Sequence, residues 1–328
     1  MTPVLVVNAG STSLKLHVVE GGDESREVSS LLQASGHVRT VAHRVVHGGP
    51  RLREPVVIDD DVRAEIDRVR ALAPLHNAPA LRSIDEAREA LPDVPHVAVF
   101  DTAFHATIPD EAATYAIPER WREWGIRRYG FHGLSVQWCS ERVRAPRLVV
   151  CHLGGGSSVT AVRDGRSIDT TMGFSPLEGV PMTTRSGSLD PGALLYLLRE
   201  RGVGAEQLDH ALEFESGMKA LGGGSGDMRE VRDLALDVFT YRVAAAIAAM
   251  AVALDGLDAL AFTAGIGENS ALVRARVCGR LGFLGVELDE RASENAGADS
   301  VISRGHVDVH VVRAREELVA ARAALTVV

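Results

Sequence analysis

The chain has 328 residues, of which 46% are hydrophobic and 24% charged, values ordinary for a globular protein with a substantial core. Its formal net charge of −9 at pH 7 offers no basic surface, so we expect no nucleic-acid partner. Any site for an anion must therefore be built locally, from arginines, backbone amides or a metal ion.

We expect no targeting or membrane-spanning segment in this sequence. The opening MTPVLVVNAG lacks a basic region, and its apolar run is too short for a signal peptide. The most apolar stretch, 243–254, falls short of the roughly 20 residues needed to cross a bilayer. Three widely spaced cysteines without a metal or redox pattern predict reduced thiols. We expect a cytoplasmic protein without a membrane partner.

Two similar segments stand out, VLVVNAGSTSLKLHVVEGG from Val4 and LVVCHLGGGSSVTAVRDGR from Leu148. Each has a β-branched run, a loop of glycine and hydroxyl residues, and a second apolar run. This pattern predicts a hairpin whose tip exposes backbone N–H groups that can surround a phosphate, because glycine permits close approach. The repetition predicts a duplicated fold that holds a polyphosphate from two sides.

The remaining elements of the first half follow in chain order. They are a strand over 38–46, a helix over 61–71, the loop APLHNAP, a helix over 81–91, a buried strand over 96–100 and an irregular basic stretch over 121–133.

The second half restarts with the repeated hairpin at residue 147. After it we expect a loop over 173–192, helices, a strand over 257–262, the loop AGIGENS opening a helix to about 281, a strand over 307–312 and a helix over 316–325. Strands alternate with helices, so the fold class is α/β. We expect two related lobes around a cleft, divided near residue 145, with the final helix packed on the first lobe.

Several polar residues occupy positions that suit phosphate chemistry. Lys15 follows the first hairpin tip, where its ammonium could reach a phosphate, although a solvated lysine in an exposed turn is the alternative. Asp101 ends a buried strand, where open α/β sheets place ligands, but it could also cap a turn. Arg44 and Arg185 could clamp a doubly negative centre or pair with structural carboxylates.

Two histidines and two loops add further candidates. His132 and His152 could each donate to a phosphoryl group or occupy ordinary core positions. The segment 264–269 follows a buried strand and starts a helix, a geometry that suits nucleotide binding. Asp227 and Arg229 could hold a base or ribose, although Asp227 is equally suited to an N-cap.

Ten strings, spread over the whole chain, then identify a family resemblance. They are NAGSTSLK (8–15), HRVVHGG (43–49), LAPLHN (72–77), FDTAFH (100–105), RRYGFHG (127–133), HLGGGSS (152–158), DTTMGFSPLEGVPMTTRSGSLDPG (169–192), SGDMREV (225–231), FTAGIGENS (262–270) and REEL (315–318). The chain resembles the acetate kinase family, whose relatives include propionate and butyrate kinases, within the actin/Hsp70/sugar-kinase superfamily. It resembles an unusually short member.

The resemblance implies two ribonuclease-H-like lobes, each a βββαβαβα unit: 1–145 plus 313–328 on the acceptor side, and 146–312 for nucleotide binding and dimerisation. It implies reversible transfer of the γ-phosphoryl group of ATP to acetate, with Mg²⁺ (or Mn²⁺ in its place), in a homodimer. Propionate or butyrate as the acceptor, or weak or lost kinase activity, are the alternatives. Phosphorylation of a hydroxyl, with Asp101 as general base, is disfavoured because a neutral alcohol needs no arginine pair.

The resemblance also implies residue roles. Asp101, His132 and Arg185 would be catalytic, Arg44 would bind the acceptor, and Asn8 and Glu316 would organise the metal. The residues implied in ATP binding are Lys15, His152, Leu153, Gly154, Gly155, Gly156, Asp227, Met228, Arg229, Gly265, Ile266, Gly267, Glu268 and Asn269.

Two departures from the family pattern concern the site. The second phosphate loop reads HLGGGSS, so Gly155 replaces the usual Asn and removes a side-chain amide. The string after FHG is Leu134-Ser135-Val136 rather than the usual TSH. Several connecting segments are also shortened.

Overall fold

A computed structural model describes residues 2–9, 14–21, 23–34, 36–230 and 233–328. Within it the chain divides into two compact units, which are described separately. The first contains residues 1–106, 115–138 and 315–328, and the second contains 107–114 and 139–314. The sequence prediction had placed the corresponding boundaries at residues 145 and 313.

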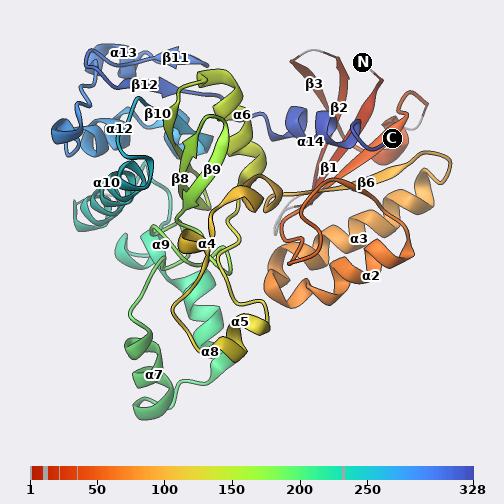
Figure 1. Cartoon of the computed structure of the whole chain (residues 1–328), viewed down its shortest axis with the longest axis horizontal. Coiled ribbons are helices and arrows are strands. Elements are labelled where there is room, and N and C mark those ends of the chain that lie inside the picture. The colour runs from red at the N-terminus through yellow and green to blue at the C-terminus, as the bar shows by residue number, and fades with distance from the viewer. Residues whose placement is uncertain (1, 10–13, 22, 35, 231–232) are drawn as a thin grey trace. The chain divides into compact units, whose positions relative to one another are not determined.

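The first unit is built on a six-stranded sheet of order β3-β2-β1-β4-β6-β5 (Figure 1). β1 pairs antiparallel with β2 and parallel with β4, which in turn pairs parallel with β6. Its strands are β1 (Val4–Ala9), β2 (Leu14–Gly21), β3 (Glu24–Val28), β4 (Thr40–Val45), β5 (Val56–Val57) and β6 (His96–Phe100). The predicted first hairpin is present, and its predicted tip at 10–13 lies outside the described residues.

Helices cover both faces of this sheet because its central strands are buried on both sides. Leu5 and Val7 pack beside Ala34 and Leu91 of the α1–α3 region, while α14 contacts β1, β4 and β6. The helices of this unit are α1 (Leu31–Ala34), α2 (Asp60–Arg68), α3 (Pro74–Ala90), α5 (Glu119–Glu123) and α14 (Glu316–Ala324), with a 3₁₀ turn at Arg70–Leu72. A second 3₁₀ turn, Ala103–Thr107, ends at the first residue of the second unit.

The second unit repeats the same strand order, β9-β8-β7-β10-β12-β11. β7 pairs antiparallel with β8 and parallel with β10, as β1 does with β2 and β4. Its strands are β7 (Arg147–Leu153), β8 (Ser157–Arg163), β9 (Arg166–Thr170), β10 (Ala259–Thr263), β11 (Ser300–Val301) and β12 (Asp308–Val311). The predicted α/β class and the duplicated design are confirmed.

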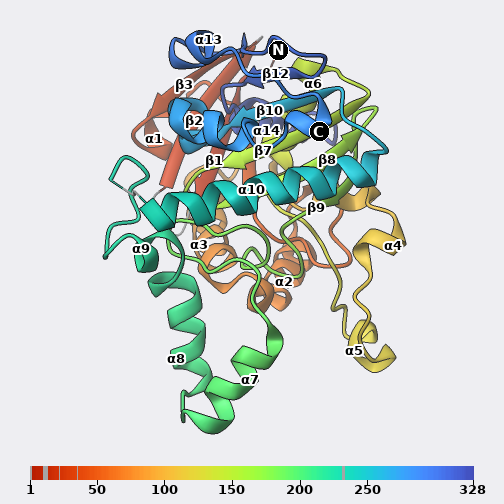
Figure 2. The ribbon, with the colours of Figure 1, turned by 90° about the vertical axis from the view of Figure 1, so that its left-hand side faces the viewer.

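α10 (Asp233–Leu254) packs across β7, β8 and β9 (Figure 2). The other helices are α4 (Asp110–Ala113), α7 (Pro191–Glu200), α8 (Ala205–His210), α9 (Gly217–Leu221), α11 (Ala264–Asn269), α12 (Ala271–Cys278) and α13 (Glu290–Glu294), a π turn at Ala211–Glu215 and a 3₁₀ turn at Gly282–Leu284. α6 (Gly133–Val143) contains the division between the units.

α10 is longer than the apolar stretch 243–254 predicted from sequence. Among the described residues, its span Leu234–Leu254 is the one helix long and apolar enough to cross a membrane by length and composition. Half of that span is buried inside the protein, and core helices pass the same test. Its buried residues Phe239, Val243 and Ile247 belong to the core of the second unit.

Two predicted loops are helical. The segment APLHNAP forms the start of α3, which begins at Pro74. Proline suits this first helical position because its missing N–H would have had no partner there. AGIGENS is likewise not a loop: Ala264–Asn269 forms α11, and Ala271 starts the separate helix α12.

Candidate active site

In the first unit, the residues predicted for the acceptor and the metal gather around Arg44. Arg44 lies on β4, and Asp101 directly follows β6, so the parallel pairing places both at the carboxyl edge of the sheet. Arg44 Nε donates to Asp101 Oδ1 (2.9 Å) and Nη2 donates to Oδ2 (2.6 Å). The Asp101 side chain is only 1% exposed. The pair is therefore a bidentate, nearly buried ion pair, a geometry with high directional specificity.

Asn8 and Glu316 complete this cluster. Asn8 Oδ1 accepts a hydrogen bond from Arg44 Nη1 (3.0 Å), and Glu316 Oε2, from the first turn of α14, lies 3.6 Å from Arg44 Nε. Burial alone would lower the pKa of Arg44, but Asp101 and Glu316 outweigh it and raise that pKa. Arg44 is therefore a permanent cation among three side chains that carry oxygen.

The oxygen donors around Arg44 suit a hard cation. Among the described residues, no three His, Cys, Asp or Glu side chains converge closely enough to form a metal site by themselves. Mg²⁺ is usually held by one or two carboxylates together with substrate phosphates and water, not by an all-protein cage. The Glu316 carboxylate and the side-chain Oδ1 of Asn8 would supply such a partial set of protein ligands.

Lys15 lies on β2 directly opposite Asn8 of β1. Residues directly opposite in an antiparallel pair project from the same face of the sheet, so Lys15 shares a face with Asn8. Lys15 is exposed, whereas Asn8 is partly buried. The lysine predicted to contact phosphate thus lies beside the charged cluster.

His132 has an unusual backbone and is tied to Asp101 through its neighbour. Its φ of 60° lies in the left-handed region, which a non-glycine residue adopts only where the surrounding structure enforces it. Gly133 N donates to the Asp101 carbonyl (3.0 Å), and a Cβ on Gly133 would lie 2.1 Å from that oxygen. Only glycine permits this close approach at position 133. The hydrogen bond therefore anchors the backbone next to His132 against Asp101.

In the second unit, the repeated hairpin forms a tight glycine loop. Gly154 N donates to Gly156 O (2.9 Å), closing the turn between β7 and β8. His152 is buried and pairs with Thr263 of β10, so the loops that follow these two parallel strands share one sheet edge. A Cβ on Gly154 would lie 3.5 Å from Ala264 Cβ. The two predicted phosphate and nucleoside loops are therefore adjacent.

A pocket of about 1070 Å³ opens at this edge, large enough for a nucleoside with phosphates. It brings together three segments that the sequence analysis had selected separately. Its lining residues are Gly154, Gly155, Thr183, Gly224, Ser225, Gly226, Asp227, Met228, Arg229, Gly265, Ile266, Asn269, Ser270, Ala271 and Leu272.

Asp227 and Arg229 bind each other at the pocket wall. Arg229 Nε and its backbone N donate to Asp227 Oδ1, each at 2.9 Å. These hydrogen bonds lower the pKa of the partly exposed Asp227 carboxyl to about 2, so it is ionised at neutral pH. The carboxylate is thus already engaged, which orders the segment that lines the pocket.

The helix α11 contributes unequally to the pocket. Gly265, Ile266 and Asn269 line it, and Asn269 Nδ2 donates to Gly265 O (2.8 Å). Glu268 is not among the lining residues, and its Oε1 accepts a hydrogen bond from Ala314 N (3.0 Å). Gly267 is buried against Phe262. Ala264, which begins the helix, has a φ of 65°.

Arg185 also lies in the second unit, held by a carboxylate that the sequence did not reveal. Its Nε lies 2.9 Å from Glu213 Oε2, and both side chains are mostly buried. Glu213 is 28 residues away in the chain and carries no motif, so only the fold identifies it. Thr183 and Leu272 of the pocket wall were also missed, although Thr183 belongs to the TTRSG string.

The duplicated sheets, the charged cluster and the glycine-lined pocket define a two-unit α/β phosphotransferase. A model of the acetokinase family matches residues 24–322. The chain belongs to the acetokinase family. The resemblance inferred from the sequence strings is confirmed.

Individual relatives agree with this assignment. The chain is 46% identical over 305 residues to the acetate kinase of Protochlamydia amoebophila, which covers 88% of this chain and 77% of the relative. It is 46% identical over 315 residues to that of Nostoc punctiforme, covering 90% and 76%.

Solved structures extend the agreement to the whole fold. A propionate kinase from Francisella tularensis superposes with a TM-score of 0.91 at 32% identity, covering 100% of both chains. An acetate kinase from Porphyromonas gingivalis gives 0.90 at 30% identity, again covering 100% of both. As a family member, the chain is a phosphotransferase with a carboxyl acceptor that uses ATP and depends on a metal ion.

Proposed function

We propose that the chain transfers the γ-phosphoryl group of ATP reversibly to acetate, giving acetyl phosphate and ADP, with Mg²⁺ as its metal. The observation that carries the proposal is Arg44, held between Asp101, Glu316 and Asn8 at the carboxyl edge of the first sheet. A carboxylate acceptor is already ionised at neutral pH and needs no strong base. The main barrier is bringing anions together, which fixed cations lower.

Each residue of the cluster then has a role. Arg44 binds the acceptor carboxylate. Asp101 engages both its oxygens with Arg44, so it orients that guanidinium and does not remove a proton. When Mg²⁺ is bound, it neutralises phosphate oxygens, and we propose Asn8 and Glu316 as the residues that hold it, with Mn²⁺ able to substitute.

The donor side uses the other predicted residues. Lys15 and the backbone of 152–156 contact the phosphates, while the segments 227–229 and 265–269 hold the nucleoside. His132 and Arg185 stabilise the transferring phosphoryl group. We propose direct in-line transfer, in which the acceptor oxygen attacks phosphorus as the bond to ADP breaks. Retention of configuration at a chiral phosphorus would refute it, because a single in-line step inverts.

The acceptor could also be propionate or butyrate. The similarity to a propionate kinase structure favours testing these acids beside acetate. Mg-ATP with each acid, followed by hydroxylamine trapping, measures acyl phosphate as hydroxamate. We expect product with acetate, and absence of hydroxamate with every acid, in protein that still binds ATP, would instead support a nucleotide-binding protein without turnover.

Two variants separate the acceptor and donor sides. Arg44→Ala should chiefly raise the KM for acetate, and Lys15→Ala should chiefly raise that for ATP, because each removes a cation from a different substrate. If both variants keep activity within about twofold of the original, these assignments fail, since a charged hydrogen bond contributes about 1.5–3 kcal/mol.

We propose that the first lobe serves the acceptor and metal, and that the second serves the nucleotide and forms a homodimer. Light scattering on the purified protein tests the dimer. A cytoplasmic location is supported by the three buried free thiols, which suit a reducing compartment.

A further inference from the structure

The ion pair between Arg185 and Glu213 joins the proposed transfer machinery to a residue outside it. Arg185 lies two residues after Thr183, which lines the pocket of about 1070 Å³, and Glu213 lies in the π turn Ala211–Glu215. Arg185 Nε is 2.9 Å from Glu213 Oε2, and the two side chains are only 14% and 16% exposed. A charge pair this well shielded from water is screened much less than a surface pair.

The π turn is fixed to the segment that carries Arg185 by hydrogen bonds that do not use the Glu213 carboxylate. Thr184 Oγ1 donates to the Glu213 carbonyl (2.7 Å), and Ser186 N donates to Leu212 O (3.3 Å). Ser216 N, directly after the turn, donates to Thr184 O (3.0 Å). π turns occur frequently at functional sites. The carboxylate is therefore held beside Arg185 by the backbone and not only by its charge.

Gly217 closes the same junction. Its φ is 62°, and a Cβ there would lie 2.2 Å from Met182 O and 2.6 Å from Arg185 O. Met182 N in turn donates to Arg185 O (3.0 Å). These contacts fix the backbone of Arg185, so the orientation of its long side chain is what remains for Glu213 to determine.

Glu213 engages one edge of the Arg185 guanidinium and leaves the other for a ligand. Nη1 reaches only Pro176 O at 3.5 Å and Met182 Sδ at 3.7 Å, both long for hydrogen bonds. Nη2 makes no hydrogen bond or ion pair to the described residues. All three guanidinium nitrogens of Arg44, by contrast, are engaged. An arginine held at Nε alone can present its Nη groups to phosphoryl oxygens.

The contact between the two side chains is close, but its hydrogen bond is incomplete. Glu213 Oε2 accepts no hydrogen bond from the described residues, so the Nε–H does not point at this oxygen despite the short distance. Hydrogen bonds of active sites are often poorly aligned without substrate and tighten when it binds. A small rotation of the guanidinium toward a bound phosphoryl group would be enough to change this alignment.

We propose that Glu213 is a positioning residue for phosphoryl transfer, which holds Arg185 at Nε so that the Nη groups meet the transferring phosphoryl group. This inference rests on the role proposed for Arg185 above. Glu213 acts through Arg185 and does not touch the reacting atoms. Neither residue lines the pocket. Loss of Glu213 should therefore lower kcat and leave the KM for ATP nearly unchanged.

Hydroxamate kinetics with Mg-ATP and acetate test the proposal. We expect Glu213→Ala to lower kcat about 10- to 100-fold, because a displacement of about 1 Å in a transition-state contact can cost that much. Glu213→Gln keeps the shape and one oxygen acceptor, so it should recover part of the loss. The KM for ATP should stay within about twofold in both variants.

Glu215→Gln is the matched control, because Glu215 lies in the same π turn but is exposed and pairs with His210 at 3.5 Å. Its kcat should equal that of the original protein. A double-mutant cycle gives the second readout. In the Arg185→Ala background, Glu213→Ala should lower kcat by less than about twofold further, because its effect passes through the guanidinium already removed.

Urea denaturation of each variant separates positioning from folding. A loss of kcat at an unchanged urea midpoint supports the proposal, and a loss that follows the midpoint in both Glu213 variants overturns it. Unchanged kcat in the Glu213 variants, an equal loss in Glu215→Gln, or additive losses in the cycle would also overturn it, while leaving the proposed function intact. An original protein that forms no hydroxamate with any acid would refute the proposed function and this role with it.

Discussion

The two candidate sites differ in composition: charged side chains form the first, and glycines contribute much of the second. In the first unit, side-chain charges converge, since Arg44 contacts Asp101, Glu316 and Asn8 within one cluster. In the second unit, five glycines and their backbone form much of the pocket wall. Removal of a charged side chain should therefore abolish most of the activity of the first site. Addition of a side chain should change ligand binding at the second site.

The largest expected effect is that of Arg44→Ala in the charged cluster. It removes the cation from the proposed acceptor site, so kcat/KM for acetate should fall about 10²- to 10³-fold. It also leaves the buried Asp101 carboxylate without its bidentate partner, which should lower the free energy of unfolding by about 3–5 kcal/mol. Hydroxamate kinetics and urea denaturation measure the two effects.

Arg63→Ala is the matched control. Arg63 makes the same bidentate pair, with Asp85 at 2.7 and 2.6 Å, but on the exposed surface of α2 and α3. Its loss should change the free energy of unfolding by less than about 1 kcal/mol. Equal losses in the two variants would contradict the view that burial makes the Arg44 pair important.

Gly133→Ala tests whether the first site also contains a position that does not tolerate a larger side chain. The new Cβ would lie 2.1 Å from the Asp101 carbonyl oxygen, so the backbone at Asp101 or His132 must shift. We expect a loss of about 3 kcal/mol in unfolding free energy and a marked fall in kcat. Gly36→Ala, where a Cβ meets no atom within 4 Å, should leave both unchanged. A fully active Gly133→Ala enzyme would contradict the proposed fit.

Acid should destabilise the first unit through its buried histidines. Burial lowers the pKa of His43 to about 3, with a further contribution from His96, and lowers that of His105 to about 4. In the unfolded chain these groups titrate near 6.5, so the unfolded state binds more protons below that pH. Their contribution to stability is complete above pH 6.5 and is lost as the pH falls toward 4. His105 alone should account for roughly 3 kcal/mol of that loss.

Tryptophan fluorescence isolates this effect, because Trp121, Trp124 and Trp138 all belong to the first unit. We expect the urea midpoint to fall between pH 6.5 and 4.5, and His105→Gln to reduce that fall by removing one titrating group. His210→Gln, at an exposed position in the second unit, should leave it unchanged. A fall of the same size in all three proteins would refute the assignment to His105.

Much of this architecture could be predicted from the sequence because its signals are local. The buried strand over 96–100 matches β6 at both ends, and both hairpins were expected from two apolar runs that flank a loop of glycine and hydroxyl residues. Asp101 could be selected because its place at a strand end is visible in the sequence. Pro74 misled the prediction, because proline marks helix starts as well as loops.

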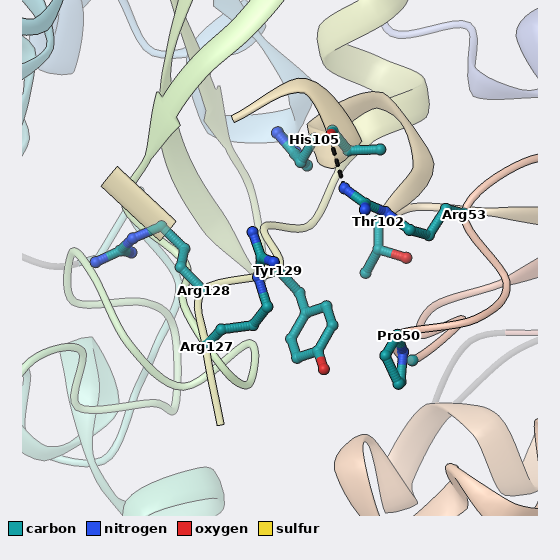
Figure 3. A pocket seen from close by; sticks show the side chains of 9 residues that line it. Pro50, Arg53, Thr102, His105, Arg127, Arg128 and Tyr129 are labelled. Atoms are coloured by element: carbon teal, nitrogen blue, oxygen red, sulfur yellow. Dashed lines mark hydrogen bonds between the residues drawn. The ribbon is translucent and has the colours of Figure 1, made fainter. Parts of the chain in front are cut away.

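Other features depend on contacts between distant segments and could not be predicted. The pairing of Arg185 with Glu213 joins a loop to a π turn, with no spacing rule to connect them. A small pocket of the first unit, lined by Arg53 and Arg127 among others, is likewise assembled from three separate segments of the chain (Figure 3). Sequence reasoning names the charged residues but cannot say which charges the fold brings together.

The smallest expected effect is that of Gly155→Asn, which adds a side chain to the second site. A Cβ at Gly155 meets no atom within 4 Å, and its φ is not in the left-handed region, so stability should change by less than about 0.5 kcal/mol. The added amide can donate to a phosphate, and one such bond is worth about 0.5–1.5 kcal/mol. The KM for ATP should therefore fall roughly two- to tenfold. Gly187→Asn, with a φ of 70° and Gly179 O only 2.5 Å from its Cβ, should instead destabilise the protein. If Gly155→Asn weakened ATP binding, the nucleotide itself would have to occupy the open space beside that loop. The second site would then tolerate added side chains no better than the first.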